Sequence, residues 1–461
     1  MAKKSKTPVL LAYTALIVLI AVAAAIVLPG SGGGEGRESS IRGKTDTEGN
    51  AHIALMNGRS IEIDGPVAGA AITANKKTIA VLEKDGTLYH TDKKQSAKNI
   101  IAENVSGYIC LRDSGLIYTD DKGISYRYSF ADMLSTKIGE LQSIIAAKNS
   151  LSVLYATEDG GIFVMAADSV EGRRVGEFED EVALSLISDD AQIAVWALED
   201  GKKHTPVVWE GEERSKLDTV TNKYAFTRAE LSDDGNFLVI LTNSGETLYM
   251  KERGKKLVSA KLGGELADAA AYTEKGHIKD SLARDISGIY AQVAAEKGSK
   301  LYWVDLDGER ETLLSGVEDF YIAGGRLVYR DLEQNLYYAE LEEEKLSEPR
   351  KISGDAEYFE LSPNGEFVYY MRDCSEEAGS LYCYRIGEQE PRKIASDAYC
   401  YTGKFDSGYV VGYFQYSRDG RSVYYWTEVG NIADTYSSCG NLMAYDYARD
   451  ESEKIAAGVY R

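Results

Sequence analysis

A short turn signal recurs along this chain and limits what the chain can fold into. Four copies, SDDAQI, SDDGNF, SPNGEF and SRDGRS, begin at Ser188, Ser232, Ser362 and Ser417. Each copy leads into a run of β-branched and aromatic residues, such as FLVIL or FVYYM. Ser, Asp and Asn side chains accept hydrogen bonds from nearby backbone N–H groups, and Gly supplies the positive φ that closes such a turn. The signal therefore predicts repeated tight turns that each start a strand.

The spacing of these turns predicts the fold class. The four serines lie 44, 130 and 55 residues apart, so the middle interval holds about three repeats. A period of roughly 40–50 residues is typical of the four-stranded blades of a β-propeller. We expect an all-β propeller over residues 51–461 with about eight blades, while seven to nine also fit the length. Degraded copies at 73–77, 111–115 and 146–150 make the first third of the domain less regular.

A second recurring element supports the same interpretation. Gly or Asn leads into Leu or Ile and an aromatic residue in GETLYMK, GSKLYWVDL and GSLYCYRI. Short runs of this composition between turn residues are typical of strands and hairpins. The 32 tyrosines fit half-buried strand surfaces, where the ring is covered and the hydroxyl stays hydrated. Continuous apolar runs predict central strands, whereas the polar segments 391–396 and 452–458 predict outer edge strands.

Together these elements resemble a known repeat. Ser-x-Asp/Asn-Gly followed by a strand and by Gly-Ser/Asn-Leu-Tyr resembles the TolB-type propeller repeat. LYWVD (301–305) and YYWTE (424–428) resemble the YWTD repeat of lipoprotein-receptor propellers. The resemblance spans residues 51–461 and implies a propeller in a bacterial cell envelope. Because this fold carries binding, scaffolding and enzymatic roles, the resemblance implies no single activity.

The N-terminus predicts a membrane anchor. Residues 9–28 form twenty consecutive uncharged positions, enough for a helix to span a bilayer. Lysines in the tail 1–8 favour a cytoplasmic N-terminus, with the propeller outside. A cleaved signal peptide, suggested by the small residues Ala23, Ala24 and Ala25, is the alternative. Residues 29–50 contain seven glycines and are expected to be a flexible tether.

Charge and cysteine content narrow the possible partners. The formal net charge is −21, a balance that repels phosphate backbones, so we expect no nucleic-acid partner. An odd number of cysteines leaves at least one thiol unpaired. Cys374 could face Cys383 across a hairpin, and Cys400 could reach Cys439 from a neighbouring strand; buried free thiols are the alternative. The five cysteines are Cys110, Cys374, Cys383, Cys400 and Cys439.

The sequence predicts no catalytic residue, no metal centre and no cofactor. Its four histidines lie in different repeats, without partners at fixed spacing, and are expected to be ordinary surface or turn residues. They are His52, His90, His204 and His277. The segment DLDGERE (305–311) resembles a calcium loop over three positions only, and we expect it to be a turn at the end of a strand.

Two irregular segments are the places to look for a binding site, because loops on a rigid scaffold carry binding groups. Residues 263–285 lengthen one repeat and could include a short helix. Residues 428–441 separate two strands and follow an aromatic-rich stretch. Exposed aromatics there would stack on sugars or anchor a peptide, whereas buried ones would be blade packing. The candidate ligand-binding residues are Asp434, Tyr436, Trp426 and Tyr413.

These observations favour a membrane-anchored, extracytoplasmic propeller that binds an envelope protein, peptide or glycan. We expect binding rather than catalysis. One alternative is a cell-envelope hydrolase of glycans or peptides that uses acidic residues, since many carboxylates are present. The other is a passive assembly scaffold, which would have no binding pocket.

Overall fold

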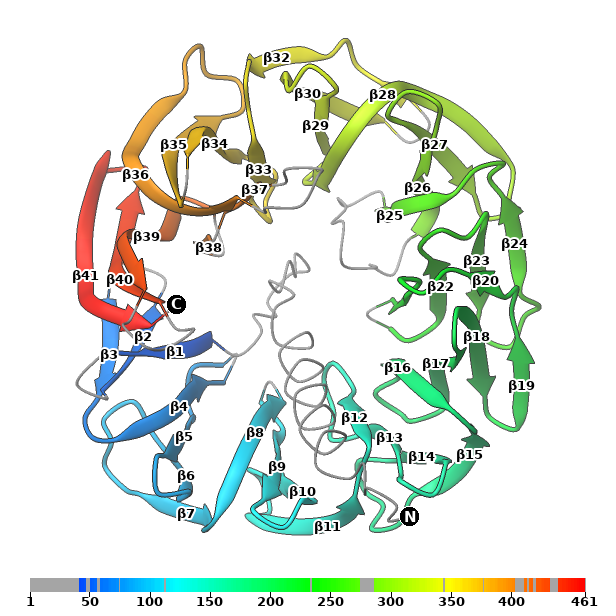
Figure 1. Cartoon of the computed structure of the whole chain (residues 1–461), viewed down its shortest axis with the longest axis vertical. Coiled ribbons are helices and arrows are strands. Elements are labelled where there is room, and N and C mark those ends of the chain that lie inside the picture. The colour runs from blue at the N-terminus through cyan, green and yellow to red at the C-terminus, as the bar shows by residue number, and fades with distance from the viewer. Residues whose placement is uncertain are drawn as a thin grey trace, which may run out of the picture. The chain divides into compact units, whose positions relative to one another are not determined.

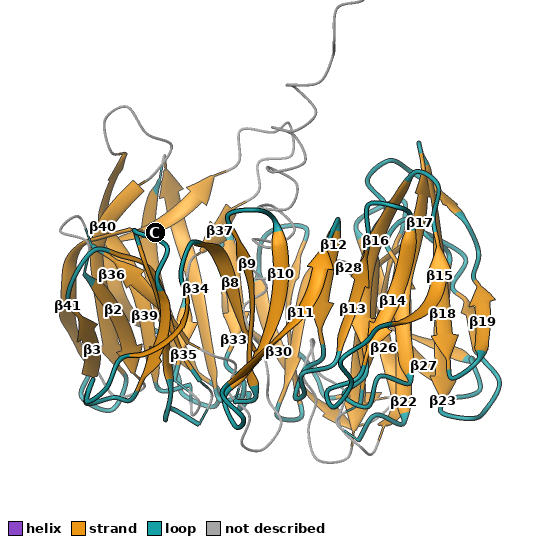
Figure 2. Ribbon diagram, turned by 90° about the horizontal axis from the view of Figure 1, so that it is seen from below, coloured by secondary structure: helices purple, strands orange, loops and turns teal. Residues whose placement is uncertain are grey.

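The structure is a computed structural model. It describes residues 41–46, 50–55, 59–73, 75–111, 113–232, 234–273, 286–342, 345–375, 377–402, 410–412, 414–417, 420–431 and 438–460. Every regular element among them is a β-strand, as Figure 2 shows, which confirms the predicted all-β class. None of these residues forms a helix long and apolar enough to cross a membrane. The predicted tail 1–8 and transmembrane helix 9–28 lie outside the described residues.

The described chain divides into two compact units, which are considered separately. The first contains residues Glu103–Thr227, and the second contains Ser31–Ala102 and Arg228–Arg461. The first unit is therefore an insertion, in sequence, between two parts of the second.

The first unit contains three antiparallel sheets in which each strand pairs with the next along the chain, except that β20 pairs with β18. The first sheet holds β8 (Val105–Leu111), β9 (Gly115–Asp120), β10 (Ile124–Ser129) and β11 (Leu134–Glu140). The second holds β12 (Ser143–Ala146), β13 (Val153–Ala156), β14 (Gly161–Met165) and β15 (Arg173–Glu177). The third holds β16 (Glu181–Ile187), β17 (Ile193–Asp200), β18 (Lys203–Glu210), β19 (Glu213–Lys216) and β20 (Val220–Thr221).

The second unit contains the remaining sheets, labelled in Figure 1. Its N-terminal sheet holds β1 (Ile41–Thr45), β2 (Ala51–Leu55), β3 (Arg59–Ile63), β4 (Val67–Ile72), β5 (Ile79–Glu83), β6 (Leu88–Thr91) and β7 (Asn99–Ala102). A four-stranded sheet holds β21 (Thr227–Leu231), β22 (Phe237–Thr242), β23 (Thr247–Glu252) and β24 (Val258–Lys261).

Two longer sheets complete the second unit. One holds β25 (Leu266–Thr273), β26 (Ile286–Ala294), β27 (Ser299–Asp305), β28 (Arg310–Ala323), β29 (Arg326–Asp331), β30 (Leu336–Glu342), β31 (Lys345–Leu346) and β32 (Arg350–Ser353). The other holds β33 (Tyr358–Leu361), β34 (Phe367–Ser375), β35 (Ala378–Arg385), β36 (Arg392–Thr402), β37 (Val410–Gly412), β38 (Gln415–Tyr416), β39 (Ser422–Asn431), β40 (Ser438–Asp446) and β41 (Glu451–Tyr460).

Two long strands join groups that the sequence analysis treats as separate blades. β28 pairs with β27 through one half and with β29 through the other. β36 likewise pairs with β35 and then, at Ala398, with β39. The four-stranded antiparallel groups are of the β-propeller type, as expected. The number of eight blades stays a prediction, because these shared strands make the sheet boundaries differ from the repeat boundaries.

The folded part begins earlier than the sequence analysis places it. Residues 41–45, assigned there to the tether, form β1 and pair with β4. This segment contains a single large apolar residue, Ile41, so its sequence alone gives only a weak strand pattern. Its pairing with β4 stabilises the strand. Asp46 then forms a bridge with Val459 of the last strand, so the two ends of the second unit meet.

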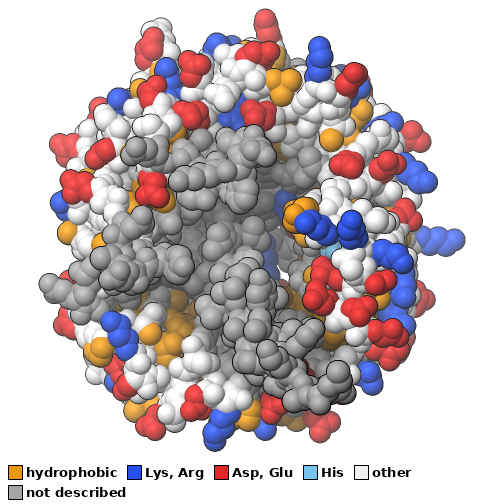
Figure 3. Space-filling model, viewed as in Figure 1, with side chains coloured by type: hydrophobic (Ala, Val, Ile, Leu, Met, Phe, Trp, Pro, Cys, Tyr) orange, Lys and Arg blue, Asp and Glu red, His pale blue; other side chains and the backbone are white. Residues whose placement is uncertain are grey.

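Burial follows the expected order of strands within a sheet. Residues 367–371 and 238–242, in the predicted central strands β34 and β22, are all buried. The last strands of the sheets are more exposed, as β19 and the first half of β41 show. Charged side chains of both signs lie side by side on the described surface in Figure 3. They discourage pairing of exposed strand edges with other chains.

Stacked aromatic pairs that each contain a tyrosine bridge adjacent strands of several sheets. Each pair is directly opposed in the strand register and stacks with ring centroids 5.0–5.3 Å apart. Such cross-strand aromatic pairs stabilise a sheet by about 0.2–1 kcal/mol each. The pairs are Tyr118–Tyr126, Tyr155–Phe163, Tyr329–Tyr337 and Tyr370–Tyr382. They explain part of the high tyrosine content.

The recurring serine turn has the geometry that the sequence predicts. The Ser362 hydroxyl donates to Asn364 Oδ1 at 2.7 Å and accepts the Phe367 N–H at 2.9 Å. Gly365 closes the turn with φ 70° and donates its N–H to the Ser362 carbonyl. Thr73 begins one of the degraded copies of the turn, at 73–77. Its hydroxyl likewise donates to Asn75 Oδ1 and accepts the Thr78 N–H. A threonine hydroxyl thus replaces the serine.

Neighbouring turns of the second unit approach one another at glycines. A Cβ placed on Gly365 would lie 2.2 Å from the carbonyl oxygen of Ala323, in the preceding turn. A Cβ on Gly420 would lie 2.5 Å from Cβ of Ser362, in the turn before it. Glycine is therefore needed here both for positive φ and for close backbone contact. The Tyr369 hydroxyl donates to the Gly420 carbonyl at 2.6 Å and fixes this spacing.

Candidate functional site

The structure describes one of the four predicted ligand-binding residues. Trp426 lies on β39 with 3% of its surface exposed, in an apolar cluster with Tyr399, Tyr424 and Leu442. This placement matches the packing alternative that the sequence analysis left open. Tyr413, Asp434 and Tyr436 lie outside the described residues, so their role in binding stays a prediction.

Three of the four histidines are buried strand residues, which corrects the expectation of surface or turn positions. His52 Nε2 lies 2.8 Å from Asp46 Oδ2, and His204 contacts Glu199 and the Thr227 hydroxyl through its two ring nitrogens. His90 is buried on β6, and loss of solvent lowers the pKa of its imidazole. His277 lies outside the described residues. A buried imidazole is tolerated in a strand when neighbouring groups form hydrogen bonds with its ring nitrogens.

The segment DLDGERE is a turn, as the sequence predicts. Asp305 Oδ1 accepts the N–H groups of Asp307 and Glu309 at 3.0 and 2.9 Å. Gly308 has φ 89°, and the turn joins β27 to β28. The other irregular segment, 263–285, contributes Leu266–Thr273 to β25. Residues 274–285 lie outside the described part, so the short helix stays a prediction there.

The most unusual chemistry of the second unit is a carboxylate held by tyrosines. Glu360 lies on β33, is 7% exposed and belongs to an otherwise aromatic and apolar strand. The hydroxyl of Tyr358, on the same strand face, donates to Glu360 Oε1. The hydroxyl of Tyr416, on β38, donates to Glu360 Oε2. We refer to Tyr358, Glu360 and Tyr416 as the tyrosine–glutamate cluster.

Edge strands of neighbouring groups bring this cluster together. β33 is the first strand of its sheet and lies beside β37 and the second half of β28. These strands can be found together near the top centre of Figure 1. Aromatic rings fix the two hydroxyls: Tyr416 lies 5.2 Å from the ring of Tyr369, and Tyr358 lies 5.8 Å from Phe414. The cluster therefore rests on a rigid aromatic support.

Burial and charge keep both tyrosines protonated. Loss of solvent raises the pKa of Tyr358 well above its usual value, and the negative charge of Glu360 raises it further. The same two causes, in the same order, raise the pKa of Tyr416. Each hydroxyl is thus a permanent donor to the carboxylate. A hydroxyl that donates to a carboxylate is polarised and becomes a better acceptor for a second donor.

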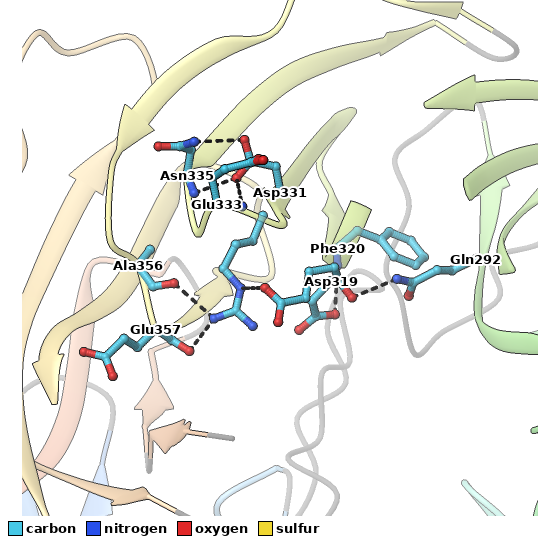
Figure 4. A network of polar contacts seen from close by, with 10 residues as sticks. Gln292, Asp319, Phe320, Asp331, Glu333, Asn335, Ala356 and Glu357 are labelled. Atoms are coloured by element: carbon cyan, nitrogen blue, oxygen red, sulfur yellow. Dashed lines mark hydrogen bonds and ion pairs between the residues drawn. The ribbon is translucent and has the colours of Figure 1, made fainter. Parts of the chain in front are cut away.

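A second polar network lies next to the cluster and ties several strands together (Figure 4). Arg330, on β29, pairs with Glu318 of β28 at 3.0 Å. Its guanidinium also donates to the carbonyls of Ala356, at 3.0 Å, and Glu357, just before β33. Gln292, on β26, donates to the Glu318 carbonyl at 2.9 Å. This arginine fixes the start of β33 and so helps to position Tyr358 and Glu360.

The cluster and the network combine fixed acceptors with aromatic surfaces. Tyr358 and Tyr416 keep intermediate exposure, whereas Glu360, which accepts from both hydroxyls, is buried. Tyrosine oxygens above a carboxylate suit N–H donors that carry positive charge, since such hydrogen bonds are shorter and stronger than neutral ones. Aromatic faces attract the same cations. The site fits an ammonium or guanidinium group better than an anion.

The sequence analysis did not find this cluster, although a signal for it existed. Glu360 lies two residues before the turn serine Ser362, in β33, the first strand of its sheet. Glu230 occupies the same position before Ser232 and pairs with Arg228 of its own strand. A comparison of this position across repeats would have singled out Glu360. Its tyrosine partner Tyr416 comes from another sheet and leaves no local pattern.

Comparison with known proteins gives no family assignment. No protein-family model matches the sequence, and no curated protein sequence is similar to it. Among solved structures, Porphyromonas gingivalis dipeptidyl peptidase 4 is similar at 10% identity and a TM-score of 0.43, over 78% of this chain and 64% of that one. The WD40 domain of SCAP from fission yeast has 11% identity and a TM-score of 0.35, over 68% and 85%. A putative TolB from Agrobacterium tumefaciens has 13% identity and a TM-score of 0.31, over 54% and 86%.

These similarities are distant. The chain spans about two thirds of the length of the peptidase that it matches. Identities of this size and TM-scores below 0.5 give no information about activity, substrate or partner.

Proposed function

We propose that this protein is a membrane-anchored, extracytoplasmic β-propeller that binds a basic segment of a protein or peptide at the cell envelope. The proposal rests on the tyrosine–glutamate cluster, in which two hydroxyls donate hydrogen bonds to a buried carboxylate. A lysine or arginine side chain would donate to the hydroxyl oxygens and lie against the aromatic rings. The net charge of −21 attracts such partners from a distance.

The location in the proposal rests on the sequence. Residues 9–28 are long and apolar enough for a single crossing, and the lysines before them favour a cytoplasmic N-terminus. Reporter fusions after residue 8 and after residue 461 test this orientation. An active periplasmic-type reporter at the second position and an inactive one at the first are expected. The opposite pattern would overturn the orientation.

The ligand class is tested by binding to arrays of envelope-derived peptides and glycans. The full chain in detergent is expected to bind Lys- or Arg-containing peptides, with an affinity that falls as salt rises. Tyr416→Phe removes one hydroxyl but keeps the ring, and should weaken binding by roughly tenfold, the value of one charge-assisted hydrogen bond. Asp434→Ala and Tyr436→Ala test whether these predicted residues contribute, and both keep the paired ends of β39 and β40.

A matched control keeps this test specific. The Tyr384 hydroxyl donates to the Glu388 carbonyl, outside the cluster, so Tyr384→Phe should bind peptides like the unmodified chain. Equal losses in Tyr416→Phe and Tyr384→Phe would reject the cluster as the site. Saturable binding to glycans alone would reject a basic segment as the ligand.

A further inference from the structure

The end of β34 places Cys374 in an unusual position. In the hairpin with β35, Arg372 is opposite Ser380 and Ser375 is opposite Ala378. Asp373 and Cys374 therefore share one opposing residue, Gly379, and form a bulge. Asp373 has φ 55°, which turns the chain at this point. Bulges of this kind redirect side chains relative to the regular alternation of a strand.

The missing side chain at Gly379 gives the Cys374 sulfur room to cross β35. A Cβ placed on Gly379 would lie 2.7 Å from Cys374 Sγ, so the sulfur lies directly over this glycine. Gly379 pairs on its other side with Ala398 of β36, two residues before Cys400. β34 and β36 also approach each other, although β35 lies between them in the sheet.

Cys374 packs against the apolar cluster that contains Cys400, and the two thiols influence each other's pKa. Cys400 is fully buried, and its N–H donates to the Glu377 carbonyl at 3.1 Å. The neighbouring thiol raises the pKa of Cys374 and lowers the pKa of Cys400. Cys374 keeps intermediate exposure, so one sulfur of the pair is accessible from outside.

The strand register separates the cysteines that the sequence analysis considered as pairs. Cys383 is opposite Tyr369, five residues before Cys374 on β34, which corresponds to about 16 Å along a strand. Cys439 is opposite Gly430 and Tyr460, whereas Cys400 is opposite Gly412. Both pairings therefore lack the close approach that a disulfide requires.

We propose that Cys374 and Cys400 are the site of a disulfide bond that forms when the protein meets a disulfide-containing oxidant. Cys374 first loses its proton to solvent, and its thiolate attacks one sulfur of an external disulfide R–S–S–R, forming a mixed disulfide at Cys374 and releasing R–S⁻. The Cys400 thiolate then attacks the Cys374 sulfur, forms the Cys374–Cys400 bond and releases the second R–S⁻. The two thiols lose two protons and two electrons, and the oxidant becomes two thiols.

This bond would restrict the backbone next to the candidate functional site. The Cys374 N–H donates to Glu357 Oε1 at 2.7 Å, and the Glu357 carbonyl accepts from Arg330. Closing the disulfide would fix the bulge that carries Cys374 and hence the segment that leads into β33. Tm should therefore rise on oxidation, since the bond restricts the unfolded chain.

The experiment uses the full chain in detergent with oxidised glutathione as the disulfide. After oxidation the protein is denatured, its free thiols are alkylated, and the alkylated cysteines are counted by mass spectrometry. We expect the count to fall by two, to return after reduction, and Tm to be a few degrees higher in the oxidised form. An unchanged count, or a bond between any other pair, would overturn the proposal.

Assigning the bond needs two proteases. Trypsin leaves Cys374 and Cys383 together in peptide 373–385, whereas chymotrypsin cuts after Tyr382 and separates them. The expected cross-link joins the Cys374 fragment to the Cys400 fragment. Cys400→Ser lacks the thiol that resolves the mixed disulfide, so after oxidation it should show no internal cross-link and should carry glutathione on Cys374. Cys439→Ser, the control, should still lose two thiols, and a loss of none would contradict the assignment.

Discussion

Two turns that precede strands, one at Ser362 in the second unit and one at residues 147–152 in the first, satisfy their polar groups from different sources. At Ser362 the hydroxyl belongs to the turn itself and accepts from the next strand. At residues 147–152 the polar group comes from the neighbouring sheet. Asp189 accepts the backbone N–H and the side-chain amide of Asn149 at 2.7 and 2.8 Å, and its carbonyl accepts from Ser152. The Ser150 hydroxyl accepts the Ser152 N–H within this turn, but the turn also depends on Asp189 of the neighbouring sheet.

A second contrast concerns what holds adjacent sheets together. In the first unit, the buried guanidinium of Arg127 on β10 donates to the carbonyls of Leu151, Ala166 and Ser169 in the next sheet, at 2.6–2.9 Å. In the second unit, glycines such as Gly365 let backbone pack directly on backbone. Arg127 joins two sheets of the first unit through a long side chain, whereas the second unit adds close backbone contacts at glycines to arginine contacts such as that of Arg326 with the Gly365 carbonyl. A repeat can diverge in sequence while the spacing of its sheets is kept.

Replacement of Arg127 should have the largest effect and should be confined to the first unit. Arg127→Met keeps the apolar stem but leaves three buried carbonyls without their donor, at a cost of about 4 kcal/mol in the free energy of unfolding. Urea unfolding followed by tryptophan fluorescence measures it, because Trp196 and Trp209 lie in this unit. Arg174→Met is the control, since its pairing with Glu177 is exposed and worth little. Equal midpoints for the two variants would contradict the contrast.

Gly365→Ala tests the corresponding feature of the second unit. The new Cβ would meet the Ala323 carbonyl at 2.2 Å, and φ is 70°, so we expect a loss of about 3 kcal/mol. Gly387→Ala is the matched control, because φ is 95° there but the space is open. It should cost about 1 kcal/mol. Similar losses for both variants, measured by urea unfolding, would show that φ alone matters and that the close turn contact does not.

The tyrosine–glutamate cluster predicts a loss of stability in alkali that adds to the loss from first-unit tyrosines such as Tyr155, whose pKa burial also raises. Since folding raises the pKa of Tyr416, the unfolded chain releases this proton at lower pH than the folded one. Its contribution is therefore complete below pH 10, and stability falls as pH rises from there, by up to about 1.4 kcal/mol per pH unit.

Tyr416→Phe should remove this part of the alkaline slope. Unfolding free energies measured between about pH 9 and 11.5 compare the variant with the unmodified chain. Tyr224→Phe, which changes an exposed ring in the first unit, serves as the control and should keep the original slope. A Tyr416→Phe slope equal to that of the control would argue against the buried hydroxyl as its source.

The turn hydroxyls predict the smallest effects. Ser362→Ala removes the acceptor of the Phe367 N–H and should cost about 1 kcal/mol, whereas Thr73→Ser keeps the hydroxyl and should change stability by less than about 0.5 kcal/mol. Chemical unfolding of both variants provides the measurement. A large loss in Thr73→Ser would mean that the threonine methyl, not the hydroxyl, stabilises that turn.

Local features of the fold could be predicted from the sequence because their causes are local. The turn at Ser362 and the buried strand after it follow from residues within ten positions of each other. The turn at Thr73 was recognisable in principle, since a threonine hydroxyl accepts the same hydrogen bond as serine. β1 was missed because its order comes from β4 rather than from its own pattern.

The candidate site could not be predicted in the same way. Glu360 and Tyr416 are separated by more than fifty residues and meet because two sheets place their edge strands side by side. β28 was unexpected for a similar reason: its middle contains Gly316 and looks like a turn, yet the strand continues into the next group. Contacts between sheets depend on the register of each sheet, which short motifs do not specify.

The bridge between Asp46 and Val459 has a consequence for how the protein is made. The strands β1 to β7 leave the ribosome first, and the whole first unit follows before the last strand of the second unit exists. Asp46 and its hydrogen-bond partner His52 are therefore synthesised long before Val459, with which Asp46 forms its bridge. Contacts this distant in sequence form slowly, so the edge of β1 stays open to chaperones and to misassembly until the final residues arrive.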